Sequence, residues 1–152
     1  MILEPDISLI NIRARSKKQV LEDIASGICH QLNAGIDCVS LLKRLMSREQ
    51  IGSTAIGGGV AIPHIRLNNI DKPIGVFVRL KNPVDFDAPD DVPVDMIYLL
   101  IAPSGTKGST LMHLSRLSNF FRNDDFCERL RHCEDPFGSI HECNAEQERA
   151  AA

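Results

Sequence analysis

The sequence contains no tryptophan, and aromatic residues make up only 5% of its 152 residues. The core must therefore be built mainly from aliphatic side chains, and the length favours a single domain. No basic stripe with interleaved aromatic residues is present, which argues against nucleic-acid binding. No apolar run reaches the length of a membrane span, and residues 1–6 lack the basic start of a signal peptide. We therefore expect a cytoplasmic protein that is not inserted into a membrane.

The sequence also offers little support for a disulfide framework or a metal site. The five cysteines include no C-x-x-C pair, and an odd number without an export signal predicts reduced thiols. His132, Cys133, His141 and Cys143 lie close in sequence, but their spacing matches no common zinc pattern. The aspartates of residues 85–91 lack the spacing of a calcium-binding loop, which favours a solvated loop. We predict neither a metal ion nor a cofactor.

What the chain does contain is a succession of helical and strand-like patterns. Ser16 and Asp37 can cap two helices that have an apolar face, at about residues 17–32 and 38–49. Strand-like segments start near residue 60 and cover residues 74–80 and 95–102, and the last is apolar enough to be covered on both faces. Further helices are predicted from about residues 110, 125 and 136.

This order of elements predicts an α/β fold. We expect a three-layer α/β/α sandwich around a small mixed β-sheet. Residues 1–143 should form one domain, and the polar and then alanine-only residues 144–152 should form a flexible C-terminal tail.

The most informative segment runs from Gly52 to His64 and joins a glycine-rich loop to a histidine. Pro63 fixes its own φ and biases the preceding residue toward an extended conformation, so His64 should stand at a strand end on a stiff backbone. The loop lacks the Gly-Lys-Ser/Thr ending of a P-loop, which excludes nucleotide binding of that kind. Taken alone, such a histidine is more often structural. Beside open backbone donors, however, a rigid imidazole suits the acceptance and transfer of a phosphoryl group.

The wider pattern around this segment is specific. Arg48 through Thr54 and Ala61 through His64 give the combination R-E-x-x-G-S-T … A-I-P-H, and residues 16–21, 83–88 and 93–103 extend it. With these segments the chain resembles the type-2 enzyme IIA domain of the phosphoenolpyruvate-dependent phosphotransferase system, from about residue 10 to 140. It looks most like the nitrogen-regulatory branch, of the fructose and mannitol type. The resemblance implies a phosphotransferase component in which His64 accepts the phosphoryl group from an HPr-like phosphocarrier protein, with Arg48 near the site.

The chemistry expected at His64 needs little besides position and charge. A neutral imidazole is nucleophilic near pH 7. Arg48 can stabilise charge on the transferred group as a planar fork of fixed charge. Ser53 and Thr54 can supply further hydrogen bonds to the phosphate, and no metal ion is required. For Arg48 the alternative is a solvated cation that offsets the helix dipole.

The resemblance fails at two positions. The family usually has a second histidine in an H-L-x-x-L pattern after the strand ending at Pro103, where this chain has Thr110. His113 lies about one helical turn further on, and either a site role or a position at the core edge is open. Ile65 stands where the family commonly has a small residue, and could narrow access to His64. We therefore weigh two hypotheses: a carrier that regulates a kinase, transporter or regulator by its phosphorylation state, and a non-catalytic binding module of the same fold.

Overall fold

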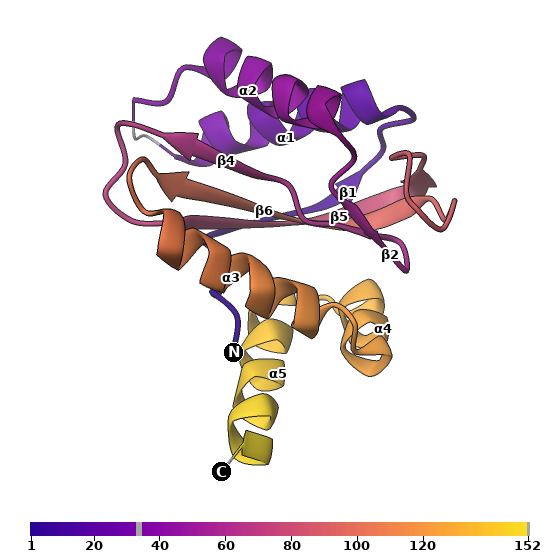
Figure 1. Ribbon diagram of the computed structural model, residues 1–152. Helices are drawn as coiled ribbons and strands as arrows, with labels where there is room; N and C mark the ends of the chain where they lie inside the picture. The colour runs from indigo at the N-terminus through magenta and orange to yellow at the C-terminus, as the bar shows by residue number, and fades with distance from the viewer. Residues whose placement is uncertain (33–34, 152) are drawn as a thin grey trace.

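The computed structural model describes residues 1–32 and 35–151, and it arranges helices on both faces of one β-sheet (Figure 1). The sheet has six strands in the order β1-β5-β6-β3-β2, and β4 also pairs with β6. The strands are β1 (Ile7–Ile12), β2 (Ala55–Gly57), β3 (Val60–Ala61), β4 (His64–Leu67), β5 (Ile74–Val84) and β6 (Val94–Pro103). The helices are α1 (Lys17–Gln31), α2 (Cys38–Ile51), α3 (Lys107–Phe120), α4 (Asp124–His132) and α5 (Pro136–Ala151).

Strand β6 is the centre of the sheet. It pairs antiparallel with β5 and parallel with β3 and β4, so the sheet is mixed, as predicted. Residues 96–102 are all buried, which explains the unbroken apolar run in this part of the sequence. Its side chains alternate between two hydrophobic clusters, because successive residues of a strand face opposite sides of a sheet. Ile97, Leu99 and Ile101 belong to the first cluster, and Met96 and Tyr98 belong to the second.

Helices α1 and α2 cover the face of the sheet that carries the first cluster (Figure 1). Both begin at the predicted caps: Ser16 accepts a hydrogen bond from the backbone N–H of Gln19 (3.1 Å), and Asp37 accepts one from that of Val39 (3.1 Å). The prediction of reduced thiols is wrong for one pair, because a disulfide joins Cys29 of α1 to Cys38 of α2. The two cysteines lie nine residues apart in the sequence, and their Cα atoms lie 5.9 Å apart.

Helices α3, α4 and α5 lie on the opposite face, which completes the predicted three layers (Figure 1). The sequence pattern places the start of α3 too late, because the helix begins at Lys107 rather than near Thr110. The predicted tail from residue 144 is also not what the structure has, since α5 continues through Ala151. Asn144 is only 3% exposed, and its side chain holds Ile2 by two hydrogen bonds of 2.9 and 3.0 Å. The last residue of the predicted tail, Ala152, lies outside the described residues.

Strands β1 and β2, and the start of β4 at His64, were not predicted. Strand β1 pairs parallel with β5, with Ile7 opposite Val76 and Leu9 opposite Val78. Strand β4 starts at His64 itself, so the histidine opens a strand as well as following one. In the described part of the chain, no helix has both the length and the apolar character needed to cross a membrane.

Candidate functional site

His64 is the first residue of β4 and lies beside the end of β6. It pairs with Leu100, and the carbonyl of the preceding Pro63 accepts a hydrogen bond from the N–H of Leu100 (3.0 Å). This bond and the fixed φ of the proline hold the backbone of His64 in place. The next residue, Ile65, packs in the core beneath α1 and α2. His64 is half-buried, and it lies against α2 together with Arg66.

The surroundings of His64 favour its neutral form. Partial burial, followed by the positive charges of Arg48 and Arg66, holds the pKa of His64 below its ordinary 6.5. Burial disfavours the charged imidazolium, and a nearby cation disfavours it further. These effects favour the neutral imidazole, which retains a lone pair for nucleophilic attack.

A pocket of about 340 Å³ opens between α2 and β4, and its polar lining is cationic. His64 and Arg66 line it from β4, and Lys43, Arg44 and Arg48 line it from α2. The lining contains four cationic side chains and no carboxylate, a composition suited to an anion. Sequence analysis singled out only Arg48 among these cations. The four-residue spacing of Arg44 and Arg48 was the signal available, because it places both on one face of a helix.

Arg48 occupies the last turn of α2. Its Nη1 donates a hydrogen bond to the carbonyl of Gly52, the residue that caps the helix (3.1 Å). In the described chain no carboxylate forms an ion pair with it, so its charge is not neutralised internally. Arg48 therefore closes the helix end, and its charge also acts on the pKa of His64. Its role in stabilising the charge of a transferred group stays a prediction.

Ser53 and Thr54 face inward toward protein partners. The Ser53 hydroxyl donates to the carbonyl of Phe86, and the Thr54 hydroxyl donates to the carboxylate of Glu49. Glu49 in turn forms an ion pair with Lys17 of α1 (2.7 Å). These contacts fasten the start of the glycine-rich loop to α1 and α2. A contact of either hydroxyl with phosphate stays a prediction.

Thr110 and His113 lie on α3. Thr110 is 2% exposed, and its hydroxyl donates to the carbonyl of Thr106, one helical turn earlier (2.8 Å). The Nδ1 atom of His113 is buried without a hydrogen-bond partner in the described chain, and burial, followed by the charge of Arg116, lowers its pKa. Neither side chain forms a hydrogen bond with His64 within the described residues. A site role for either residue stays a prediction.

Ile65 is 6% exposed and belongs to the core beneath α1 and α2. Ile65 also lines the pocket between α2 and β4, beside His64. That it narrows access to His64 stays a prediction. For the metal, no group of three or more His, Cys, Asp or Glu side chains in residues 1–32 and 35–151 is arranged to hold an ion.

Comparison with known proteins shows the family and the fold of the chain. Residues 1–138 match the family described as "Phosphoenolpyruvate-dependent sugar phosphotransferase system, EIIA 2". The chain is 39% identical over 130 residues to a nitrogen regulatory protein of Pseudomonas aeruginosa, covering 86% of this chain and 84% of that protein. It is 36% identical over 134 residues to one of Bradyrhizobium diazoefficiens, covering 88% and 86%.

Solved structures share the fold of this chain. The nitrogen regulatory protein IIA-Ntr of Neisseria meningitidis superposes with a TM-score of 0.80 at 31% identity, covering 90% of this chain and 91% of that one. The mannitol IIA protein of Escherichia coli superposes with a TM-score of 0.70 at 16% identity, covering 90% and 94%, which shows a shared fold.

Proposed function

Because the chain belongs to the EIIA 2 family of the phosphoenolpyruvate-dependent sugar phosphotransferase system, we propose that His64 is its phosphoryl acceptor. The donor would be the phosphohistidine of an HPr-like phosphocarrier protein. The observation that carries the proposal is the position of a neutral imidazole on the rim of a pocket lined by four cationic side chains.

The proposed transfer follows from this arrangement. The lone pair of one His64 ring nitrogen attacks phosphorus, a new P–N bond forms, and the P–N bond to the donor histidine breaks. The charge of the transferred group spreads over its three equatorial oxygens, which Arg48 and Arg66 can stabilise. The step requires no metal ion, because the donor is a phosphohistidine and the charge is met by protein cations.

The output of the protein would be regulatory. A phosphate adds a charge of about −1.5 to −2 near neutral pH. On His64 it would offset much of the positive charge of the pocket, and so change which protein surfaces can bind there. We propose that partner proteins such as a kinase, a transporter or a transcriptional regulator distinguish the two states by this change. The similarity to nitrogen regulatory proteins supports this output over sugar transport.

A reconstituted reaction tests the acceptor. The protein is incubated with enzyme I, an HPr-like protein and phosphoenolpyruvate, and its intact mass is measured before and after acid treatment. We expect an acid-labile gain of one phosphate that is absent in His64→Ala and present in His113→Ala and in the exposed His30→Ala. No gain in the wild-type protein would overturn the carrier proposal.

Because Thr110 stands where the family usually has a second histidine, a second candidate function is a binding module with slow or no phosphoryl transfer. The buried Thr110 hydroxyl is committed to its own helix and carries no charge. The variant Thr110→His, in the same assay, tests whether the missing histidine limits the rate. A faster reaction would identify Thr110 as the limit, and an unchanged rate in a folded variant would show that the site works without the second histidine.

A further inference from the structure

The disulfide between Cys29 and Cys38 joins the last turn of α1 to the first turn of α2, and these helices lie side by side on one face of the sheet (Figure 1). The two Cα atoms are 5.9 Å apart, a distance that a disulfide spans without movement of the backbone. The sequence predicts a cytoplasmic protein, and disulfides in that compartment are usually transient or redox-sensing. The pair is therefore a candidate for reversible oxidation.

The disulfide is accessible to small molecules. A pocket of about 510 Å³ opens between α1 and α2, and both cysteines line it. Ser26 and His30 of α1 and Val39 of α2 are also part of its lining. Cys38 is exposed and Cys29 is half-buried, so both sulfur positions lie near solvent. The volume falls within the range of small-molecule sites, which leaves room for a thiol to approach the bond.

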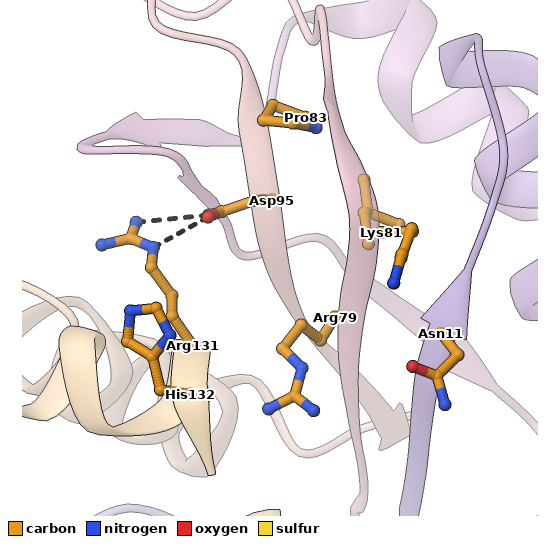
Figure 2. Close-up of a pocket in the computed structure, with 8 residues that line it drawn as sticks. Asn11, Arg79, Lys81, Pro83, Asp95, Arg131 and His132 are labelled. Atoms are coloured by element: carbon orange, nitrogen blue, oxygen red, sulfur yellow. Dashed lines mark hydrogen bonds and ion pairs between the residues drawn. The ribbon is translucent and has the colours of Figure 1, made fainter. Parts of the chain in front are cut away.

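The other three cysteines are poorer targets for the same chemistry. Cys127 and Cys143 are buried, and burial raises the pKa of Cys127 to about 11 and that of Cys143 above its ordinary value. The thiolate is the reactive form of cysteine, so both should react slowly. Cys133 is a half-buried free thiol directly after α4, the helix that Arg131 joins to Asp95 of β6 (2.8 Å; Figure 2).

Helix α2 connects the disulfide to the candidate site. The disulfide fixes the start of this helix, and the ion pair of Glu49 with α1 fixes its end. Arg44 lies between them, six residues after Cys38 or roughly 9 Å along the helix axis. Its Nη1 donates to the carbonyl of Arg66 (3.1 Å), which lines the same pocket as His64. Movement at the start of α2 can therefore reach β4 through this hydrogen bond.

We propose that Cys29 and Cys38 are a reversible redox site whose oxidised state fixes the start of α2 and, through Arg44, the cationic side of the His64 pocket. Oxidation by a small disulfide such as oxidised glutathione removes two electrons and two protons from the two thiols. The S–S bond between the cysteines forms, and the S–S bond of the oxidant breaks to give two thiols; excess small thiol reverses the step. In the reduced state, the Cys29 thiol has an acceptor at hand, because the carbonyl of Ile36 lies 3.9 Å from its Sγ.

Thiol mapping of the intact protein tests the redox site. The folded protein is treated with oxidised glutathione or with dithiothreitol, its free thiols are alkylated, and its peptides are identified by mass spectrometry. We expect peptides joined at Cys29 and Cys38 after oxidation, alkylation of both residues after reduction, and return of the bond on reoxidation. Absence of the joined peptides, or a bond that dithiothreitol does not open in the folded protein, would overturn the proposal.

The coupling to α2 is measured on the same two states. Closing the ring should raise the melting temperature by roughly 5–10 °C, because it restricts the unfolded chain. Reduction should speed amide hydrogen exchange at the start of α2 by about threefold or more, because this end of the helix loses its link to α1. It should also shift the NMR signal of the His64 ring. Identical exchange, or an unmoved His64 signal, would contradict the coupling.

Two serine variants locate the effect. Cys38→Ser, at an exposed position, should behave as the reduced protein under both conditions. Cys133→Ser is the matched control, because Cys133 packs against the second hydrophobic cluster, on the other face of the sheet, and it should respond as the wild-type protein does. A redox response that persists in Cys38→Ser, or that is lost in Cys133→Ser, would overturn the assignment. None of these measurements requires phosphoryl transfer, so the redox site and the phosphoryl acceptor are tested separately.

Discussion

At the residue scale, the protonation state of His64 decides what the site can do. A nucleophile must keep its lone pair, and His64 keeps it because burial and two arginines act in the same direction on its pKa. If His64 is phosphorylated, the same arginines face an anion. Their effect then changes from disfavouring a proton on the imidazole to stabilising the phosphorylated product. Under the proposed function, the cationic pocket would serve both the acceptor and the phosphorylated state.

The first prediction concerns this pKa. Titration of the His64 ring by NMR should give a value below 6.5, and Arg48→Gln should raise it by removing one cation. The exposed Arg122→Gln should leave it unchanged. Since the unfolded chain binds this proton more tightly, His64 should also lower the stability of the fold as the pH falls through 6.5. A wild-type pKa at or above 6.5 would contradict this account.

The residues around His64 show how much of the candidate site can be predicted from the sequence. The R-E-x-x-G-S-T and A-I-P-H motifs mark the position of the site. They do not separate residues that face the pocket from residues that hold the loop, because that depends on partners far along the chain, such as Phe86 for Ser53. Arg66 was missed because it becomes part of the pocket only when β4 packs against α2.

At the element scale, the buried Glu49 connects α1, α2 and the loop that leads to His64. Its side chain is 5% exposed, forms an ion pair with Lys17 and accepts hydrogen bonds from the hydroxyl and, at 3.4 Å, the backbone N–H of Thr54. Removing one member of such a buried set leaves the others without that partner. This lowers the free energy of unfolding more than the loss of an exposed ion pair does.

The second prediction follows for the stability of the fold. Glu49→Ala should lower the free energy of unfolding by about 3 kcal/mol, because it leaves Lys17 and Thr54 without their shared partner. Glu22→Ala, at an exposed position of α1, should change it by less than about 0.5 kcal/mol. Urea unfolding followed by circular dichroism measures both. Equal unfolding midpoints for the two variants would show that Glu49 does not fasten these elements.

The elements themselves were predictable where their periodicity is strong. Helices α1 and α2 follow their apolar faces and caps, and β5 and β6 follow their apolar runs. Strand β1 was missed because it is short and its partner, β5, lies more than sixty residues further along the chain. The extent of α5 was missed because its second half is polar apart from small alanines, and a single contact with the N-terminus buries Asn144.

At the scale of the whole molecule, that contact joins the two ends of the described chain. Asn144 accepts a hydrogen bond from the N–H of Ile2 and donates one to its carbonyl, both in a buried position. Ile2 itself packs in the second hydrophobic cluster, with residues of α3, α4 and α5. The C-terminal helix therefore forms part of the folded unit, and the α/β/α layers extend beyond the boundary predicted from composition.

The third prediction tests this contribution. Asn144→Ala should destabilise the protein by about 1–3 kcal/mol, because it leaves a buried N–H and a buried carbonyl without partners. Asn119→Ala, on the exposed side of α3, is the control and should have little effect. Thermal unfolding of both variants provides the comparison. If Asn144→Ala and the wild-type protein unfold at the same temperature, residues 144–151 behave as the predicted tail.

The central claim for the molecule is that one imidazole, His64, receives the phosphoryl group. The most direct measurement is tandem mass spectrometry of the protein after reaction with enzyme I, an HPr-like protein and phosphoenolpyruvate, under neutral conditions that preserve phosphohistidine. The account predicts a single phosphate whose fragment ions place it on His64. A phosphate on His113 or on any other residue, or no phosphate at all, would contradict it.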